Sequence, residues 1–398
     1  MFSSFLIKLL AGINLLIGLA FRKGLKPAYS FCEIKSILVK RTDRLGDAYF
    51  VLPLLRQLAR DYDLTVLTSR YNDFFLREFF KTKVFCEGPL NMVGCVKMIF
   101  KTLFLRIRRK KTEHYQYDLF LDLNGIRELD IFNKVYQQNL CKYYAGFNMG
   151  IWNLLLDYCY PWYPALFRRK NLLEVYGEFL KKSLGIEVGI SFGTDLSIRA
   201  KAPDGFSLKG DFILVNIAGR GKFRGPSVRF YAELINALDF SGVFVVLDEL
   251  GNPNLEKAKM LVRKDNVFYL TRTLSIWELS YVVAKSKLYI GADSGITHIL
   301  QHHTNAIIFF GGVEPQVWRP YSQNPYLKKR RGCIWIEETS TDQDRFKKII
   351  YTPVWCRPCF DIGCRKPRCI LGLEKNEKII LQEIQKSLND ILSSRLNS

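Results

Sequence analysis

Short apolar runs and stretches of helical periodicity alternate along most of the chain. The apolar runs predict buried strands at residues 36–40, 64–68, 117–123, 212–217, 243–248 and 287–290. Apolar residues three or four positions apart predict helices from residue 52 onward and at residues 172–184, 229–239 and 273–284. The last of these helices begins with a capping box, in which Ser275 is followed three residues later by Glu278. Strands that alternate with helices indicate βαβ units and therefore parallel sheets.

The pattern is interrupted once and then starts again. The polar stretch from Ala200 to Gly210 contains Pro203 and Gly205 and is the best linker candidate. A length of 398 residues also favours two domains. We therefore predict an α/β protein with two Rossmann-like domains, at residues 34–205 and 206–345. Because such sheets bind ligands at the carboxyl ends of their strands, we expect the domains to face each other across a cleft.

Residues 1–33 are predicted to form a separate amphipathic segment. Over residues 2–21 the apolar side chains fall on one face of a helix, Lys8 and Asn14 interrupt the segment, and three cations follow it closely. These polar residues argue against a membrane-spanning helix. The segment fits either an interfacial helix lying on anionic lipid or a helix that docks on the protein's own surface.

The chain is strongly basic. Lysine and arginine exceed aspartate and glutamate by 59 − 38 = 21, which gives a formal net charge of +21. Such an excess attracts nucleic acid, an anionic membrane or a phosphorylated substrate, and it does not choose among them. With 48% hydrophobic and 14% aromatic residues, the composition excludes a disordered chain. The sequence contains no convincing cleavable secretory signal, so we expect a cytoplasmic location.

The ten cysteines fall into two groups. Six are scattered through apolar contexts and are predicted to be reduced core residues: Cys32, Cys86, Cys95, Cys141, Cys159 and Cys333. The other four lie in the final segment, residues 346–398, with the compact spacing of a four-thiolate site: Cys356, Cys359, Cys364 and Cys369. A structural zinc ion, reduced thiols and two local disulfides are all compatible with this spacing.

The stretch from Gly291 to His298 combines a predicted strand end, a tight glycine turn and a helix start. This layout presents backbone N–H groups to an anion. Asp293 and Ser294 are typical helix N-caps, and His298 in the first turn is able to donate a charge-assisted hydrogen bond to phosphate or ribose. Taken alone, such a stretch is more often a purely structural joint than a binding site.

Two other stretches combine glycine with charge after a predicted strand. Gly46 allows a tight turn after the first strand and places Asp47 at the edge of the expected cleft, although Asp47 by itself is typical of a helix cap. Residues 218–226 combine three glycines with Lys222 and Arg224. Small residues let the backbone approach a diphosphate, and the cations neutralise its charge.

Together these stretches resemble the signatures of glycosyltransferase family 9, the ADP-heptose:lipopolysaccharide heptosyltransferases. Residues 41–47 are similar to the R-x-D-R-x-G-D motif of that family, and residues 293–298 are similar to its D-S-G-x-x-H motif. Residues 306–321 resemble the next strand, the glycine-rich turn and the W-x-P-Y tail of the family. This chain departs from the family at Ile296, where proline is usual, and in the glycine-rich loop, where Phe223 and Gly225 replace lysine and tryptophan.

The resemblance implies a GT-B fold and an inverting, metal-independent transfer of heptose from ADP-heptose to the lipopolysaccharide inner core. It places the general base on Asp47, which takes the proton of the acceptor hydroxyl, with Asp43 as the second candidate. Glu256 lies where the family often contacts the nucleotide ribose, and a solvated helix carboxylate fits this position equally well. The residues expected to bind substrate are Asp43, Arg44, Gly46, Gly219, Lys222, Arg224, Glu256, Asp293, Ser294, Gly295 and His298.

The resemblance also implies partners and a location. The partners are ADP-heptose or a similar nucleotide sugar, a lipid-anchored glycan acceptor and the anionic inner face of the cytoplasmic membrane, on which the protein is expected to be peripheral. No cofactor is expected for catalysis, and nucleic acid is not an expected partner because the sequence contains no known nucleic-acid-binding module. In the family's fold the C-terminal helix, residues 374–392, packs on the first domain.

Two alternative functions stay open at this stage. One is a related glycosyltransferase that uses another nucleotide sugar to build a surface glycan, which the departures at Phe223 and Gly225 keep in consideration. The other, more remote, is a basic nucleic-acid-binding protein, which the net charge alone would explain.

Overall fold

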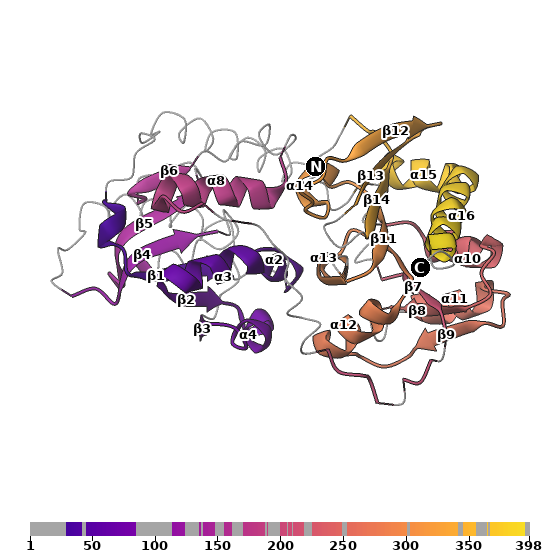
Figure 1. The fold of residues 1–398 in the computed structure, drawn as a ribbon, viewed down its shortest axis with the longest axis horizontal. Helices are drawn as coiled ribbons and strands as arrows, with labels where there is room; N and C mark the ends of the chain where they lie inside the picture. Colours follow the sequence, from indigo (N-terminus) through magenta and orange to yellow (C-terminus); the bar gives the residue numbers. More distant parts are fainter. Residues whose placement is uncertain are drawn as a thin grey trace. The chain divides into compact units, whose positions relative to one another are not determined.

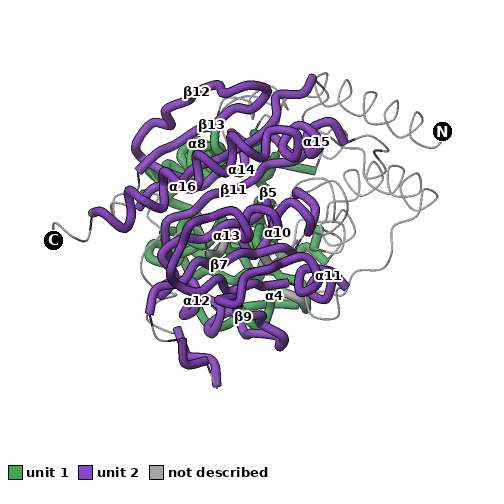
Figure 2. The backbone as a smooth tube through the Cα atoms, turned by 90° about the vertical axis from the view of Figure 1, so that its right-hand side faces the viewer, with its two compact units in different colours: residues 1–191 green, residues 192–398 purple. Residues whose placement is uncertain are grey.

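A computed structural model of the chain divides into two compact units, residues 1–191 and 192–398, and each is described here by itself (Figures 1 and 2). The structure describes residues 29–41, 45–84, 114–123, 135–136, 138–147, 155–160, 170–187, 189, 200–204, 206–208, 210–218, 225–248, 253–300, 303–340, 345–355, 364 and 367–394. The predicted amphipathic helix at residues 2–21 lies outside these residues. No helix in the described ranges is both long enough and apolar enough to cross a membrane.

The first unit contains a six-stranded, fully parallel sheet with the strand order β3-β2-β1-β4-β5-β6. Its strands are β1 (Ser36–Arg41), β2 (Asp63–Thr68), β3 (Lys81–Val84), β4 (Tyr117–Asp122), β5 (Cys141–Phe147) and β6 (Tyr158–Tyr160). Its helical segments are η1 (Phe31–Glu33), α2 (Leu45–Phe50), α3 (Leu52–Asp61), α4 (Arg70–Leu76) and α8 (Leu172–Leu184). The order 3-2-1-4-5-6 is the Rossmann order, in which ligands bind outside the carboxyl ends of the strands.

Local sequence signals account for the helices of this unit. In α3, Pro53 occupies the first turn, where its missing N–H group has no intrahelical partner, and the leucines at 52, 54, 55 and 58 form the buried face. Helix α8 begins at Asn171 with a capping box completed by Glu174. It ends at Gly185, which adopts the left-handed conformation with φ 71°. The predicted helix at residues 172–184 is therefore confirmed.

The second unit contains an eight-stranded sheet with the order β12-β13-β14-β11-β10-β7-β8-β9. Its strands are β7 (Phe212–Asn216), β8 (Val243–Leu247), β9 (Val267–Leu270), β10 (Leu288–Ala292), β11 (Asn305–Phe310), β12 (Leu327–Arg331), β13 (Ile334–Ser340) and β14 (Phe346–Tyr351). Its helices are α10 (Val228–Ala237), α11 (Asn254–Leu261), α12 (Ile276–Lys285), α13 (Gly295–Leu300), α14 (Pro315–Trp318), α15 (Arg368–Lys375) and α16 (Glu377–Ser394). The six neighbouring strands from β14 to β9 pair in parallel, whereas β13 pairs antiparallel with both β12 and β14.

The predicted strands and the capping box of this unit are confirmed. Helix α12 starts after Ser275, whose hydroxyl accepts from the Glu278 N–H, and the Glu278 carboxylate accepts from the Ser275 N–H. Helices α10, α15 and α16 cover one face of the sheet, and α12 and α13 lie on the other (Figure 1). The sequence did not predict β12 and β13, because their charged residues break the apolar pattern of a core strand.

The apolar face of the C-terminal helix, which was predicted to pack on the first domain, is buried in the second unit. In α16 the apolar residues Ile380, Ile384 and Leu388 are fully buried in the core of the second unit, together with residues of α10 and α15. The Gln385 amide reaches the backbone of Asp239, just beyond α10. The i, i+4, i+8 stripe predicted a buried helix face, but a stripe does not specify which surface buries it.

The prediction of six buried cysteines is only partly confirmed. Cys141 and Cys159 are buried in the first unit, whereas Cys32 and Cys333 are exposed. Cys32 lies in the single turn of η1, and Cys333 lies in the tight turn between β12 and β13, so neither belongs to an element with a buried face at that position. Cys86 and Cys95 fall outside the described residues.

His303 is buried just before β11, near Arg345 and Lys347 at the start of the neighbouring strand β14. Burial, with Arg345 and Lys347 adding to it, lowers the pKa of His303 from 6.5 to about 4. Above pH 6.5 neither the native nor the unfolded chain protonates this residue, so it does not affect stability there. Between pH 6.5 and about 4 only the unfolded chain takes up the proton, so stability falls as the pH decreases.

We expect His303 to lower the free energy of unfolding by about 3 kcal/mol when the pH is decreased from 7 to 4. Urea unfolding of the wild type and of His303→Gln at several pH values measures the effect. The glutamine variant should lose this part of the pH dependence. If the unfolding free energies of the wild type and of His303→Gln change with pH by the same amount over the whole range, His303 is not buried in its neutral form.

Candidate active site

The carboxyl end of β1 carries the predicted general base. Asp47 lies in the first turn of α2 and is partly exposed, and the adjacent Gly46 is buried. Arg41, the last residue of β1, donates two hydrogen bonds to the backbone carbonyl of Asp47, from Nη2 at 2.8 Å and from Nε at 3.2 Å. The guanidinium therefore fixes the turn that presents Asp47 at the end of the strand.

Arg41 is fully buried, and its other contacts join three elements. Its Nη1 donates to the carbonyl of Leu123 at 2.9 Å and to the hydroxyl of Tyr176 at 3.0 Å. The Tyr176 hydroxyl donates to the same Leu123 carbonyl at 2.9 Å. The sequence pattern gave no sign of this role of Arg41, because Leu123 and Tyr176 lie 82 and 135 positions away.

A second buried cation lies beside Arg41 at the same edge of the sheet. Lys40 is completely buried on β1, and its Nζ lies 3.5 Å from the Asp122 carboxylate on the neighbouring strand β4. The two residues are register partners. This pair links the ends of β1 and β4 next to Asp47.

In the second unit, the joint between β10 and α13 brings together four of the predicted residues, Asp293, Ser294, Gly295 and His298. Asp293 is held at the end of the sheet because its N–H donates to the carbonyl of Phe309 on β11 at 2.9 Å. His298 Nε2 lies 3.2 Å from Asp293 Oδ1, and both side chains are buried. The ring of Trp318 lies 5.8 Å from the His298 ring, tilted by 46°. The imidazole therefore has a carboxylate and an aromatic ring as close neighbours.

The start of α13 is held by hydroxyl groups. Ser294 Oγ accepts from the Thr297 N–H at 3.3 Å, so Ser294 caps the helix as expected. Thr297 Oγ1 in turn donates to the Ala292 carbonyl and contacts the Tyr289 hydroxyl at 2.8 Å. The Asn216 amide donates to the same tyrosine hydroxyl at 2.9 Å. This buried network ties the helix start to the ends of β10 and β7.

The same network reaches the edge of the glycine-rich loop. Asn216 Oδ1 accepts from the N–H of Ala218, the first residue of the glycine-rich stretch. At the other edge, a Cβ atom on Gly225 would lie 2.4 Å from Ala292 Cβ, so a side chain at position 225 would force the loop away from β10. Glycine at this position lets the backbone approach the strand end. The loop itself, with Gly219, Lys222 and Arg224, lies outside the described residues, as do Asp43 and Arg44.

Glu256 and the described cysteines do not form part of this network. The Glu256 side chain is 71% exposed on α11 and pairs with Lys259 at 2.7 Å, as a solvated helix carboxylate does. Cys364 and Cys369 are free thiols, and Cys356 and Cys359 lie outside the described residues. Within the described ranges, no group of three or more His, Cys, Asp or Glu residues could hold a metal ion. The four-cysteine metal site therefore stays a prediction.

Comparisons with known proteins give a family and a fold. The family profile described as glycosyltransferase family 9 (heptosyltransferase) matches residues 106–350. The structure is similar to the glycosyltransferase family 9 protein from Veillonella parvula, with a TM-score of 0.51, 15% identity and coverage of 72% of this chain and 83% of that one. It is also similar to Escherichia coli heptosyltransferase WaaC with ADP, with a TM-score of 0.51, 16% identity and coverage of 72% and 90%.

A third solved structure aligns with more of this chain. It is the dodecameric iron-containing heptosyltransferase TibC from enterotoxigenic E. coli, in complex with ADP-D-beta-D-heptose, with a TM-score of 0.49, 10% identity and coverage of 91% and 77%. No curated protein sequence matches the chain. Identities this low show the fold alone, and the predicted GT-B fold of two Rossmann-like units is confirmed by the two structures with a TM-score of 0.51.

Proposed function

The chain belongs to glycosyltransferase family 9, and on this premise we propose that it transfers heptose from ADP-heptose to the inner core of lipopolysaccharide with inversion at the anomeric carbon. The observation that carries the proposal is the buried pair Asp293–His298, at the carboxyl edge of the second sheet beside the glycine-rich loop. In a Rossmann-like unit this edge is where a nucleotide binds. Transfer of a glycosyl group is the activity of the family.

The second unit would bind the donor. The helix start at Ser294 and Gly295 offers backbone N–H groups to the diphosphate, and His298 adds a donor whose orientation is set by Asp293 and Trp318. Lys222 and Arg224 in the adjacent loop would neutralise the charge that develops on the departing ADP. Gly219 would let the loop backbone approach the phosphates, and Glu256 would reach the ribose.

The first unit would supply the base. Asp47 takes the proton from an acceptor hydroxyl while that oxygen attacks the anomeric carbon of heptose from the face opposite to ADP. The new glycosidic bond forms as the bond to the diphosphate breaks, and ADP leaves with the electron pair. Gly46 and the Arg41 contacts to the Asp47 carbonyl hold the carboxylate at the strand end, while Asp43 and Arg44 orient the acceptor. The chemistry requires no catalytic metal, because the cations and N–H groups named above stabilise the leaving group.

The partners follow from the charge and from the acceptor. A net charge of +21 would draw the protein to the anionic inner face of the cytoplasmic membrane, where a lipid-anchored acceptor is located. The amphipathic segment at residues 1–33 would reinforce a peripheral attachment there. A structural zinc ion bound by the four cysteines of the final segment completes the proposal.

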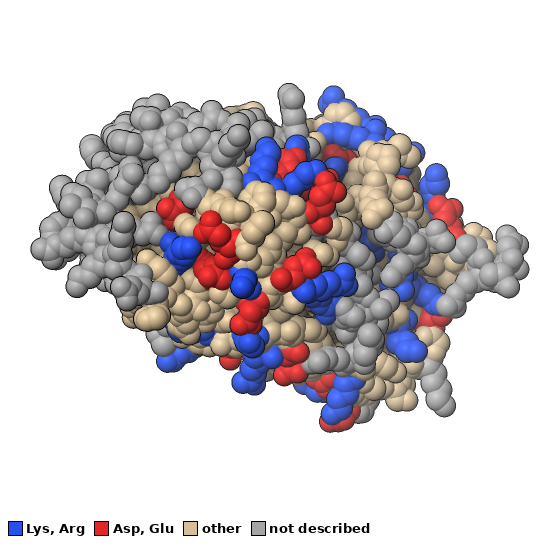
Figure 3. Space-filling view, turned by 60° about the vertical axis from the view of Figure 1, so that its left-hand side comes forward, with Lys and Arg blue, Asp and Glu red and all other residues tan. Residues whose placement is uncertain are grey.

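One face of the molecule gives no support for a nucleic-acid-binding function. On the face shown in Figure 3, the coloured Lys and Arg side chains are interspersed with Asp and Glu side chains and do not form one continuous basic area. Nucleic-acid-binding proteins present a basic patch or stripe. Another nucleotide sugar is the stronger alternative, because Phe223 and Gly225 depart from the family's loop.

A donor screen followed by a transfer assay tests the proposal. We expect ADP and ADP-heptose to raise the melting temperature, and a ligand at about 100 times its Kd should add about 2.7 kcal/mol of stability. UDP- and GDP-sugars should have no such effect. Mass spectrometry of a heptose-deficient lipopolysaccharide core should then show one added heptose. Stabilisation by UDP- or GDP-sugars in place of ADP would favour the alternative glycosyltransferase, and stabilisation by none of them would contradict both.

A further inference from the structure

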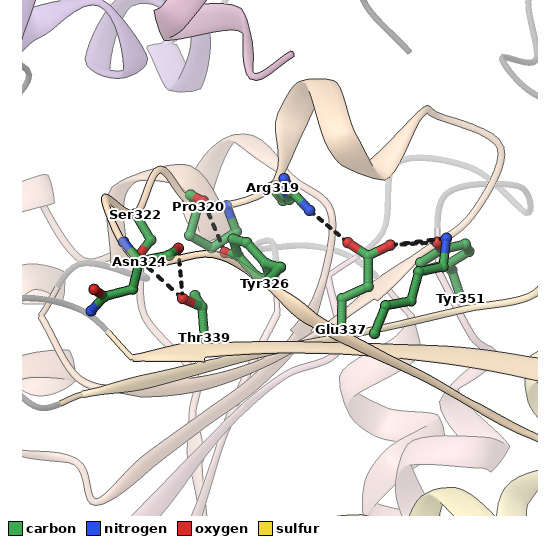
Figure 4. A network of polar contacts seen from close by, with 9 residues as sticks. Arg319, Pro320, Ser322, Asn324, Tyr326, Glu337, Thr339 and Tyr351 are labelled. Carbon is green, nitrogen blue, oxygen red and sulfur yellow. Dashed lines mark hydrogen bonds and ion pairs between the residues drawn. The ribbon is translucent and has the colours of Figure 1, made fainter. Parts of the chain in front are cut away.

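A buried carboxylate on β13 is the centre of a polar network in the second unit (Figure 4). The Glu337 side chain is 1% exposed, and both of its oxygens are engaged. Oε2 accepts from Arg319 Nη1 at 2.7 Å, and Oε1 accepts from the Tyr351 hydroxyl at 2.6 Å. Lys328 Nζ lies 3.4 Å from Oε1. The carboxylate therefore has partners on β12, on β14 and in the segment after α14.

Stability alone does not account for this arrangement. Taking a carboxylate out of water costs several kcal/mol, and apolar residues of similar volume are often as stabilising as a buried ion pair. Buried ion pairs differ from apolar contacts in fixing direction, because a guanidinium and a carboxylate bond in one geometry. This ion pair is therefore expected to fix the position of the segment that carries Arg319.

The ion pair holds the segment that follows Trp318. The Arg319 guanidinium lies over the ring of Tyr326 at 4.1 Å, and the Tyr326 hydroxyl donates to the carbonyl of Pro320 at 2.9 Å. Further along, the hydroxyl of Thr339 near the end of β13 lies 3.2 Å from the Ser322 hydroxyl and donates to the Asn324 carbonyl at 3.0 Å (Figure 4). The whole connection from residue 319 to residue 326 is thus attached to the sheet through β13.

The residue before this ion pair touches the candidate active site. Trp318 directly precedes Arg319, and its ring lies 5.8 Å from the ring of His298. His298 in turn lies 3.2 Å from Asp293. A continuous series of contacts therefore runs from Glu337 through Arg319 and Trp318 to His298.

We propose that Glu337 is a positioning residue of the donor site: by holding Arg319, it keeps Trp318 against His298 and so sets the orientation of the imidazole. Its effect on nucleotide affinity rests on the proposed function, whereas its effect on His298 does not. The carboxylate has no part in the reaction itself.

The chain contains a matched control for this proposal. Glu383 on α16 is also 1% exposed and also lies among three cations, with Lys329 at 2.8 Å, Arg331 at 2.9 Å and Lys348 at 3.7 Å. Two of these cations are on β12 and one is on β14, and none lies between residues 318 and 326. Loss of the Glu383 charge should therefore disturb the same sheet to a similar extent without a direct path to Trp318.

The experiment compares Glu337→Gln with Glu383→Gln in the full chain. The protein has four histidines, so ¹³C-histidine labelling gives a short NMR spectrum in which His298→Gln identifies the His298 signal. We expect both variants to lower the melting temperature. Only Glu337→Gln should shift the His298 signal, and only this variant should weaken ADP binding, by about tenfold or more. Arg319→Lys breaks the same link from its half-buried side and should reproduce the shift if Glu337→Gln does not fold.

Three outcomes overturn the proposal. The first is an unchanged His298 signal in Glu337→Gln or, where that variant does not fold, in Arg319→Lys. The second is a shift of the His298 signal in Glu383→Gln that equals the shift in Glu337→Gln. The third is an equal loss of ADP affinity in the two glutamine variants. A wild-type protein that does not bind ADP would instead refute the proposed donor, and the His298 signal would still decide whether Glu337 positions the imidazole.

Discussion

Replacement of Asp47 by asparagine is expected to lower kcat for sugar transfer by about 10²–10⁴-fold, the range that a positioned general base contributes. The amide keeps the size of the side chain and the hydrogen bonds that Arg41 makes to the Asp47 backbone carbonyl, but it cannot accept the proton. Because the proposed donor contacts all lie in the second unit, ADP affinity should stay at the wild-type value. Steady-state kinetics with ADP release as the readout, together with calorimetric ADP binding, measure the two quantities.

Two variants serve as controls for this prediction. Asp61→Asn removes an exposed carboxylate at the end of α3 and should leave the rate unchanged. Asp43→Asn tests the second candidate base and should reduce the rate less than Asp47→Asn does. The base assignment fails if Asp47→Asn transfers sugar at the full rate, and it moves to Asp43 if the order of the two losses is reversed.

Loss of the Arg41 side chain is expected to have the largest effect on stability. Arg41→Met leaves the carbonyl of Asp47 without its guanidinium donor, whereas the carbonyl of Leu123 keeps the hydroxyl of Tyr176 as a donor. Hydrogen bonds to a charged group contribute about 1.5–3 kcal/mol each, and the side chain makes several of them, so the free energy of unfolding should fall by about 3 kcal/mol or more. Arg41→Lys retains the charge but cannot reach all of these acceptors. Its free energy of unfolding should therefore lie between those of Arg41→Met and the wild type.

Urea unfolding followed by circular dichroism measures these differences. Lys142→Met removes an exposed cation from the same sheet, where it pairs with Glu33, and should change the unfolding free energy by less than about 0.5 kcal/mol. Any Arg41 variant that remains folded should also lose kcat, because the turn that carries Asp47 has lost its anchor. If Arg41→Met has the urea midpoint of the wild type, the described contacts of Arg41 do not stabilise the first unit.

Features that depend on neighbouring residues were predictable from the sequence. The apolar runs identified the central strands of both sheets, and Ser275 with Glu278 identified the start of α12. Gly185 marked the end of α8 because a residue without a side chain ends a helix in the left-handed conformation at low cost. Of the candidate site, the stretch around Asp293 was identified as a strand end followed by a helix start, which the structure confirms.

Features that depend on distant partners were not predictable. The strands β12 and β13 carry lysine, arginine and glutamate residues, and an isolated apolar pattern gives no reason to place such residues in a sheet. They are stable there because Glu383 of α16 neutralises cations of β12, and Arg319 neutralises Glu337 of β13. The packing of α16 on the second unit was not predictable either, because its apolar stripe is compatible with more than one surface.

The sequence by itself determined the α/β class, the places of the central strands of both sheets and of several helices, and the kinds of chemical group found where those strands end. Only the tertiary structure decided the partners of the buried charges, such as Arg41 with Leu123 and Tyr176, or Glu337 with Arg319 and Tyr351. The physical reason is the range of the interactions. Backbone conformation and burial periodicity are set within a few residues, whereas a buried charge is stabilised only where the fold brings its partners within hydrogen-bonding distance.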